Sequence, residues 1–327
     1  MAHMIDTTAG NAIAYRGQTP WHGLGQTIDA TDDIDTIVTK ARLNYTVEGA
    51  PVLFTPHARL TDPGLGILRS MKTVPGRKVL YRSDTLQPLS VVSRDYNVVQ
   101  PAEVLEFFRE LVRVGGFSIE TAGALSGGRR VWALARLGEG ANIIGQDRVR
   151  PFLLLATSYD GTMATMAKYV NERVVCHNTI TMALGEDSHQ VKVYHSQKFD
   201  PAAVRHDMGI ALNSFETWLL RARRLAERPV SEQEAGTLTI DLLRPTVTLD
   251  DVTKSRGYQQ IMALFDGQAI GSGLTEGGTA WQWLNAATEY VDHVRGRTAD
   301  TRMNSAWFGD GDRLKTRAES LAAALVS

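Results

Sequence analysis

The pair Cys176 and His177 is the first feature of the sequence that could do chemistry. A thiol beside an imidazole can act as a nucleophile. Together with Asp160, Arg173 and Asn178, it would form an enzyme site for nucleotides or protein. A lone cysteine that follows two valines is more often a small core residue. An enzyme centred on these residues is therefore kept as an alternative to a non-enzymatic protein.

Zinc and nucleotide cofactors are the next possibilities. Structural zinc needs about four ligands at compact spacing, and Cys176, His177, His189 and His195 match no finger or ribbon spacing. The glycine-rich stretch 123–130 lacks the lysine and the following serine or threonine of a phosphate-binding loop. We therefore expect no metal and no cofactor.

An Asp-Gly pair, Asp160–Gly161, lies between an apolar strand at 152–157 and a return strand that runs to about Val170. This pair favours a hairpin, because both central positions of the preferred turn take a positive φ. We expect Arg173 to hydrogen-bond the turn, whose carbonyl groups can satisfy a guanidinium. The expected structural polar cluster consists of Ser158, Asp160, Thr162 and Asn178.

Positive charge gathers between Arg69 and Arg94, where six basic residues stand against one acidic residue, Asp84. Tyr81 and Tyr96 are interleaved with them. Cations that contact phosphates and rings that stack on bases are typical of surfaces for single-stranded nucleic acid. A solvated outer face is the alternative explanation. The predicted contacts are Lys72, Lys78, Arg82, Arg94, Arg129, Arg130, Lys168 and Arg173.

Strands and one amphipathic helix must position these residues. The helix is predicted at 101–114, where a proline opens it and a broad apolar face follows. Alternating and apolar runs predict strands at 45–54, 78–82, 89–92, 117–121, 130–136 and 151–157. The predicted fold class is α+β, with a mostly antiparallel sheet, an intervening amphipathic helix and a helical C-terminal half.

The composition changes past Asp200, where a long helix to about Arg228 is predicted. Further helices are predicted to open at Ser231, which begins a capping-box pattern, and over 254–265, 279–294 and 312–326. We therefore divide the chain into an irregular segment at 1–30, an α+β sheet domain at 31–195 and a helical region at 196–327.

Bulk properties restrict where the protein acts. The chain has 327 residues, a formal net charge of −1 and one cysteine, so a disulfide within the chain is impossible. It contains no apolar run of the length that spans a bilayer, about 18 residues, and no signal-peptide pattern. We expect a cytoplasmic protein that has no membrane partner.

Eight short motifs are spread along the chain: Thr19–Gly25, Arg94–Gln100, Gly127–Leu134, Ser158–Thr162, Arg173–Thr179, Asn285–His293, Ser305–Gly309 and Leu314–Ala318. Together they resemble the phage/plasmid-like protein family known as domain of unknown function 932. The resemblance implies an origin in a mobile element but no established chemistry. Tyr159 stands where histidine is expected in this family, which argues against a general base at this position.

The resemblance and the charge distribution lead to one functional hypothesis. The predicted antiparallel sheet, amphipathic helix and basic turn resemble those of the single-strand annealing proteins of phages, which is an analogy at the level of the fold. We expect a non-enzymatic protein of DNA recombination that binds single-stranded nucleic acid, with DNA as the expected ligand and RNA as the alternative, and that forms homo-oligomers. The second alternative, besides the enzyme, is a protein-interaction module that inhibits host defence through its helical half.

Overall fold

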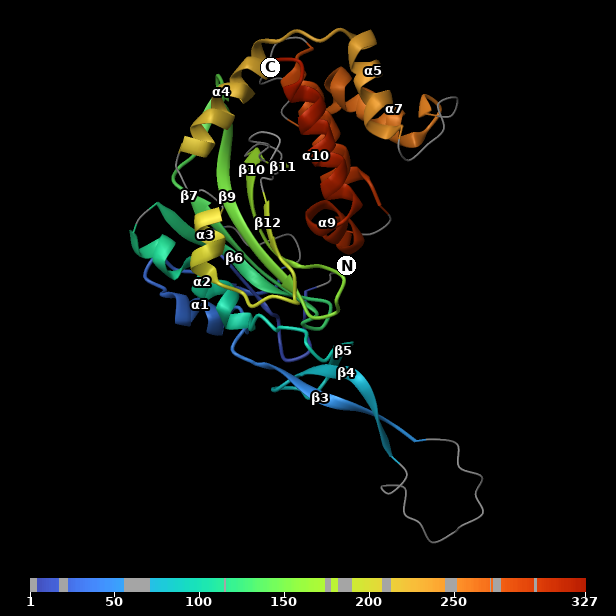
Figure 1. Cartoon of the computed structure of the whole chain (residues 1–327). Coiled ribbons are helices and arrows are strands. Elements are labelled where there is room, and N and C mark those ends of the chain that lie inside the picture. The colour runs from blue at the N-terminus through green and yellow to red at the C-terminus, as the bar shows by residue number, and fades with distance from the viewer. Residues whose placement is uncertain are drawn as a thin grey trace.

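The computed structural model describes residues 5–17, 23–55, 71–114, 116–173, 178–181, 190–207, 213–244, 252–270, 272, 278–296 and 299–327. Its α+β class confirms the fold prediction (Figure 1). Strands and two helices make up the first half of the chain, and the C-terminal half is helical. Most of the motif at Thr19–Gly25 lies outside the described residues.

The main sheet has nine strands in the described part of the chain. Its order is β11-β10-β9-β7-β6-β1-β2, while β12 also pairs with β10 and β8 with β9. Every pairing is antiparallel except that of β1 with β2. The strands are β1 (Ile13–Tyr15), β2 (Gln26–Thr27), β6 (Phe117–Leu125), β7 (Arg130–Leu137), β8 (Ala141–Ile144), β9 (Asp147–Ser158), β10 (Thr165–Arg173), β11 (Asn178–Thr181) and β12 (Gln190–Val193).

Both faces of the main sheet are covered, which explains why β9 is apolar at nearly every position. Leu153 and Leu155 belong to the larger core, which also contains Phe107 of α2 (Pro101–Val114). Phe152 and Leu154 point to the opposite face and belong to a second core, against which aromatic residues of α9 (Ala299–Phe308) pack. A strand that is buried on both faces loses the apolar-polar alternation of a half-exposed one.

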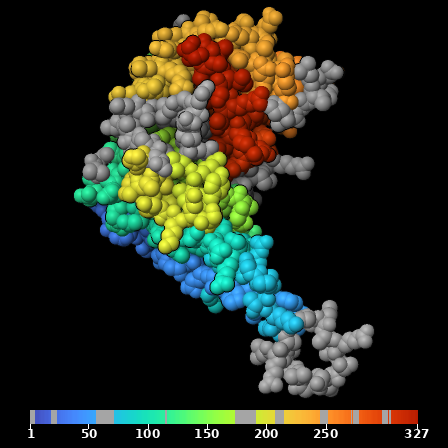
Figure 2. All heavy atoms as spheres, in the orientation of Figure 1, coloured from blue at the N-terminus to red at the C-terminus, as the bar shows by residue number. Residues whose placement is uncertain are grey.

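A second sheet of three strands has the order β3-β4-β5. These strands are β3 (Val47–Phe54), β4 (Lys72–Arg82) and β5 (Pro88–Ser93). We call the far end of β3 and β4, residues 51–55 and 71–77, the arm. It extends away from the body of the molecule (Figures 1 and 2). β4 begins earlier than the predicted strand at 78–82, and its pairing with β3 shifts register between Pro51 and Leu53.

The remaining elements are helices. α1 (Ile34–Lys40) precedes β3, and the C-terminal half contains α3 (Pro201–Asp207), α4 (Asn213–Glu227), α5 (Glu232–Leu243), α7 (Arg256–Ala263), η2 (Leu264–Gln268), α8 (Ala280–Glu289), η4 (Tyr290–Val294), α9 and α10 (Asp310–Ala323). The single long helix predicted from Asp200 to Arg228 is described as two helices, α3 and α4. Ser231 caps α5 as predicted, since its side chain accepts from the backbone NH of Glu234.

The helical half is fastened to the main sheet by buried polar contacts. The indole of Trp281 on α8 donates to Asp147 Oδ2 on β9 at 2.8 Å. The ammonium of Lys168 on β10 lies 2.5 Å from Asp312 Oδ1 on α10. Among the helices that the structure describes, none is both long and apolar enough to cross a membrane.

Candidate nucleic-acid interface at the junction of the two sheets

Arg82, at the end of β4, joins the small sheet to the rest of the molecule. Its side chain is only 1% exposed. The guanidinium donates to the carboxylate of Asp6 and to both oxygens of Asp84, at 2.9 and 2.6 Å. It also lies over the ring of Tyr45, 3.9 Å from the centroid. The hydrogen bond from Arg82 lowers the pKa of Asp84. The carboxylates of Asp6 and Asp84 thus both hold one buried cation.

The turn between β6 and β7 packs against this cation. Gly128 lies in the left-handed region, with φ at 87°. A Cβ at this position would be 2.9 Å from Arg82 Nη1 and 2.9 Å from the hydroxyl of Tyr45. Because glycine has no Cβ, the tip of this hairpin can approach the small sheet closely.

The predicted hairpin around Asp160 and Gly161 is present. β9 and β10 pair in antiparallel register, and Gly161 has φ at 72°. Asp160 Oδ1 accepts from the backbone NH of Thr162 at 3.0 Å and from its hydroxyl at 2.5 Å. Ser158 Oγ donates to the carbonyl of Met163 at 2.8 Å. The connection is longer than a two-residue turn, because it spans residues 159–164.

Two tyrosines and a histidine tie this connection to the segment after β5. The hydroxyl of Tyr96 donates to the carbonyl of Ser158 at 2.7 Å. The hydroxyl of Tyr159 donates to the carbonyl of Val99 at 2.9 Å. His195 stacks on Tyr96 with the ring centroids 4.2 Å apart. Burial raises the pKa of both phenols and lowers the pKa of His195, so these groups serve as neutral structural elements at neutral pH.

We call this region, with Arg82 at its centre, the junction. The hydroxyls of Tyr96 and Tyr159 cannot supply a base at neutral pH, because they are protonated and donate to backbone carbonyls. Tyr159 also donates its backbone NH to the carbonyl of Arg129 at 2.8 Å. The junction therefore fixes three surface segments beside one another: the loop after β5 and the two hairpin turns.

Residues 88–309, more than half of the chain, match the family model described as Domain of unknown function (DUF932). The chain belongs to this family. No curated protein and no solved structure matches it. The DUF932 region includes the two hairpin turns and His195, whereas Arg82 and the arm precede it.

The surface of the DUF932 region carries cations around these turns. Arg94 and Arg129 are exposed, and Arg130 is half-buried with Nη2 3.0 Å from Thr162 Oγ1. Lys192 and Tyr194 are exposed beside the β9–β10 connection, and Tyr194 is 62% exposed. The pairing of Thr165 with Val193 brings them to this end of β10. We call these five residues the rim.

The strand register shows which rim side chains share a face. Arg130 pairs with Ser158, and Met166 pairs with both Ala156 and Lys192. Because side chains alternate between the two faces of a sheet, Arg130 and Lys192 project from the same face. Tyr194 follows Lys192 by two positions and continues this alternation. A ring and two cations therefore lie on one side of the sheet, next to the loop of Arg94 and the turn of Arg129.

Three of the predicted phosphate contacts are instead used inside the protein, which corrects the sequence analysis. Arg82 is buried between carboxylates. The side chain of Lys168 is 3% exposed, and its ammonium donates to Asp312 and to the carbonyl of Trp307. Burial lowers the pKa of Lys168, while Asp312 opposes this shift. Lys78 is half-buried and donates to the carbonyl of Tyr96 at 2.8 Å.

Arg173, at the end of β10, and Asn178, at the start of β11, are not at the turn, which is a second correction. Arg173 pairs with Val149 and with Asn178. The nine residues of β10 separate Arg173 from the turn by about 30 Å at the usual rise of a strand. Asn178 therefore does not join Ser158 and its neighbours, and Asp160 and Arg173 do not form one enzyme site. Cys176 and His177 lie outside the described residues.

Two rim residues were missed by the sequence analysis. Lys192 and Tyr194 lie on or directly after β12, whereas the sequence analysis predicted no strand there. The signal was present, because Val191 and Val193 pack against the larger core and alternate with Lys192 and Tyr194. A period of two over five residues would have predicted a strand with one polar face. Lys72 lies on the arm, away from the rim.

Proposed function

We propose that this protein binds single-stranded nucleic acid, DNA in particular, through the rim. In this proposal it acts in the cytoplasm, as a protein of a phage or plasmid that anneals single strands during DNA recombination. The observation that carries the proposal is the grouping of four cations and an exposed tyrosine around two rigidly held turns. The expected phosphate contacts no longer include Arg82, Lys78 and Lys168. They are the rim cations, which solvent can reach.

The chemistry of the rim fits an extended strand. Within the described part of the chain, no hydrogen bond or ion pair occupies the side chains of Arg94, Arg129 and Lys192. Exposed cations of this kind neutralise phosphates and release counterions. The ring of Tyr194 offers a flat surface on which an unpaired base can stack, worth about 1–3 kcal/mol per base. Stacking requires an unstacked base, which favours single strands over duplex.

The junction supplies rigidity to this surface. The Tyr96 and Tyr159 hydroxyls fix the loop after β5 to the β9–β10 connection, and the backbone of Tyr159 fixes that connection to Arg129. Side chains that project from a fixed backbone lose less conformational freedom on binding than those on a free loop. In this proposal the buried hydroxyls of the junction hold the backbone in place, and the exposed side chains of the rim contact the nucleic acid.

A titration of fluorescent single-stranded and duplex DNA at several salt concentrations tests this proposal. We expect tighter binding of the single strand. Three or four phosphate contacts predict that log K falls with log salt with a slope of about −2 to −3. Absence of affinity for any nucleic acid at low salt, or an affinity independent of salt, would show that the rim has another role.

A further inference from the structure

The described residues of the arm include apolar side chains that no other part of the described chain covers. Leu53, Phe54 and Met71 are 52%, 47% and 42% exposed. Phe54 pairs with Lys72 across the hairpin, so these residues lie close together on two adjacent strands. Exposed apolar groups on an open strand edge are a liability for a soluble chain, and they often mark a place where another protein binds.

The arm is also positively charged. In its described residues, 51–55 and 71–77, Lys72 and Arg77 are the ionisable side chains, and neither is balanced by a carboxylate in the arm. Both cations are exposed. A partner for this surface therefore needs an apolar pocket that is bordered by negative charge.

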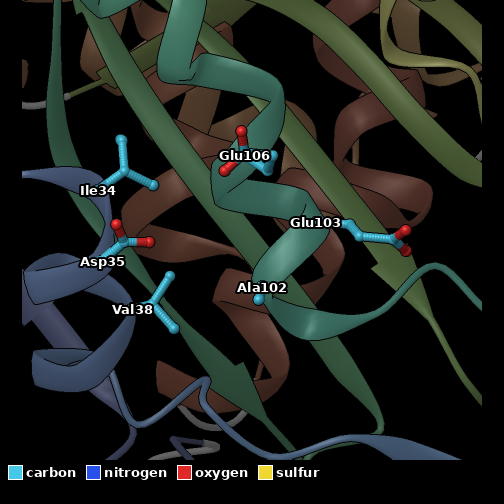
Figure 3. Close-up of a pocket in the computed structure, with 6 residues that line it drawn as sticks. All are labelled: Ile34, Asp35, Val38, Ala102, Glu103 and Glu106. Carbon is cyan, nitrogen blue, oxygen red and sulfur yellow. The ribbon is translucent and has the colours of Figure 1, made fainter.

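The chain itself provides such a pocket between α1 and α2 (Figure 3). A groove of about 340 Å³ is lined by the apolar residues Ile34, Val38 and Ala102 and by the carboxylates Asp35, Glu103 and Glu106. Arg109 lies between two of these carboxylates, 2.8 Å from Asp35 and 2.7 Å from Glu106. The carboxylate of Glu103 instead accepts from the backbone NH of Gln100 at 2.6 Å. With one cation against these three carboxylates, the residues around the groove keep a net negative charge.

The loop before α1 adds further negative charge beside the groove. Asp29, Asp32 and Asp33 precede the helix, and Lys40 pairs with the first two. Asp33 caps the helix by accepting from the backbone NH of Thr36. The surface around the groove therefore complements the arm both in charge and in apolar character.

We propose that the arm of one copy of this protein docks into the α1–α2 groove of a second copy. The side chain of Phe54 or Leu53 would fill the apolar floor, and Lys72 would approach Asp35 and Glu106. The arm points away from α1 and α2 of its own chain (Figure 1), so the contact forms between copies. Because arm and groove are different surfaces, the interface is head-to-tail and builds a ring or a filament.

This interface goes beyond the proposed function, because it needs no nucleic acid. A single rim offers only a short track for an extended strand, and copies joined through this interface would offer several rims to one strand. The interface and the rim share no residue, so each can be tested while the other is intact.

The test measures the mass of the full-length protein in solution by light scattering, over a range of concentrations and without nucleic acid. An arm variant, Leu53→Ser with Phe54→Ser, and a groove variant, Asp35→Lys with Glu106→Lys, are compared with the wild type. Leu220→Ser is the matched control, because this residue of α4 is 59% exposed and lies outside both surfaces. Circular dichroism confirms that each variant is folded.

We expect the wild type and the control to assemble with increasing concentration, and each interface variant to be monomeric. The decisive sample is an equimolar mixture of the two variants. The arm variant keeps its groove and the groove variant keeps its arm, so the mixture should form a dimer and nothing larger. A monomeric wild type, an arm variant that still assembles, or a mixture that stays monomeric would overturn the proposal.

Discussion

Both halves of the β3–β4 hairpin contain apolar and basic residues, but buried side chains lie in the near half and the far half is exposed. In the near half, Leu80 is 0% and Arg82 is 1% exposed. In the far half, Phe54 is 47% exposed. The change occurs where the register shifts, since Thr73 pairs with Leu53 but Lys78 pairs with Pro51. Extra residues in β4 at this point therefore separate a packed sheet from a free arm.

This difference shows that position along a strand, rather than residue type, decides what a basic side chain does. Arg82 and Lys72 belong to one strand and to one cluster of positive charge. Arg82 is enclosed by the carboxylates of Asp6 and Asp84, whereas Lys72 is exposed on the arm. The near half is explained by contacts within the chain. For the far half we propose a contact with a second copy.

The largest expected effect is at the near end. Arg82→Met should lower the free energy of unfolding by about 3–5 kcal/mol, because it leaves the buried carboxylate of Asp6 without its cation. Chemical denaturation followed by circular dichroism measures this change. The double variant Arg82→Met with Asp6→Asn should recover part of the loss, since it removes the unpaired charge. A loss below about 1 kcal/mol would mean that Arg82 is not the anchor of the small sheet.

The same site predicts a dependence on acid. Arg82 lowers the pKa of Asp84 below its ordinary value of 3.8, so the carboxylate is more acidic in the folded than in the unfolded protein. This contribution to stability is fully present above pH 3.8 and is lost as the pH falls through the lowered pKa. In Arg82→Met that part of the acid dependence should disappear. Unfolding curves at several pH values for both proteins compare the two slopes.

A smaller difference in the free energy of unfolding is expected between substitutions of two lysines of β4. Lys78→Met should cost about 1 kcal/mol, because its ammonium donates to the carbonyl of Tyr96 at 2.8 Å. Lys72→Met should change the free energy of unfolding by less than about 0.5 kcal/mol, as expected for an exposed position. Equal effects of the two substitutions would remove the distinction between the near and far halves.

Local patterns in the sequence were sufficient for much of the fold. α2 spans Pro101–Val114 as predicted, because its apolar period and its opening proline are both local signals. The hairpin at Asp160–Gly161 and the cap at Ser231 are also decided by neighbouring residues. Such features can be predicted because the residues that cause them lie within one turn of the chain.

The partners of buried charges could not be predicted in this way. Asp6 lies 76 residues from Arg82, and Asp312 lies 144 residues from Lys168. A count of basic residues in a window contains no information about carboxylates so far away, so the sequence pattern alone predicts both cations at the surface. Tyr194 differs, because its signal is local: Val191 and Val193 alternate with Lys192 and Tyr194 along and directly after a strand of only four residues, β12.

Charge reversal at the rim tests the central claim most directly. The variant Arg129→Glu with Arg130→Glu is compared with the wild type and with Arg113→Glu, a single charge reversal at an exposed arginine of α2. We predict that the rim variant stays folded, as circular dichroism would show, and binds single-stranded DNA at least about tenfold more weakly at low salt. Its slope of log K against log salt should be flatter by about 1.4, for two lost phosphate contacts. An affinity and a slope equal to those of the wild type and the control would contradict the account.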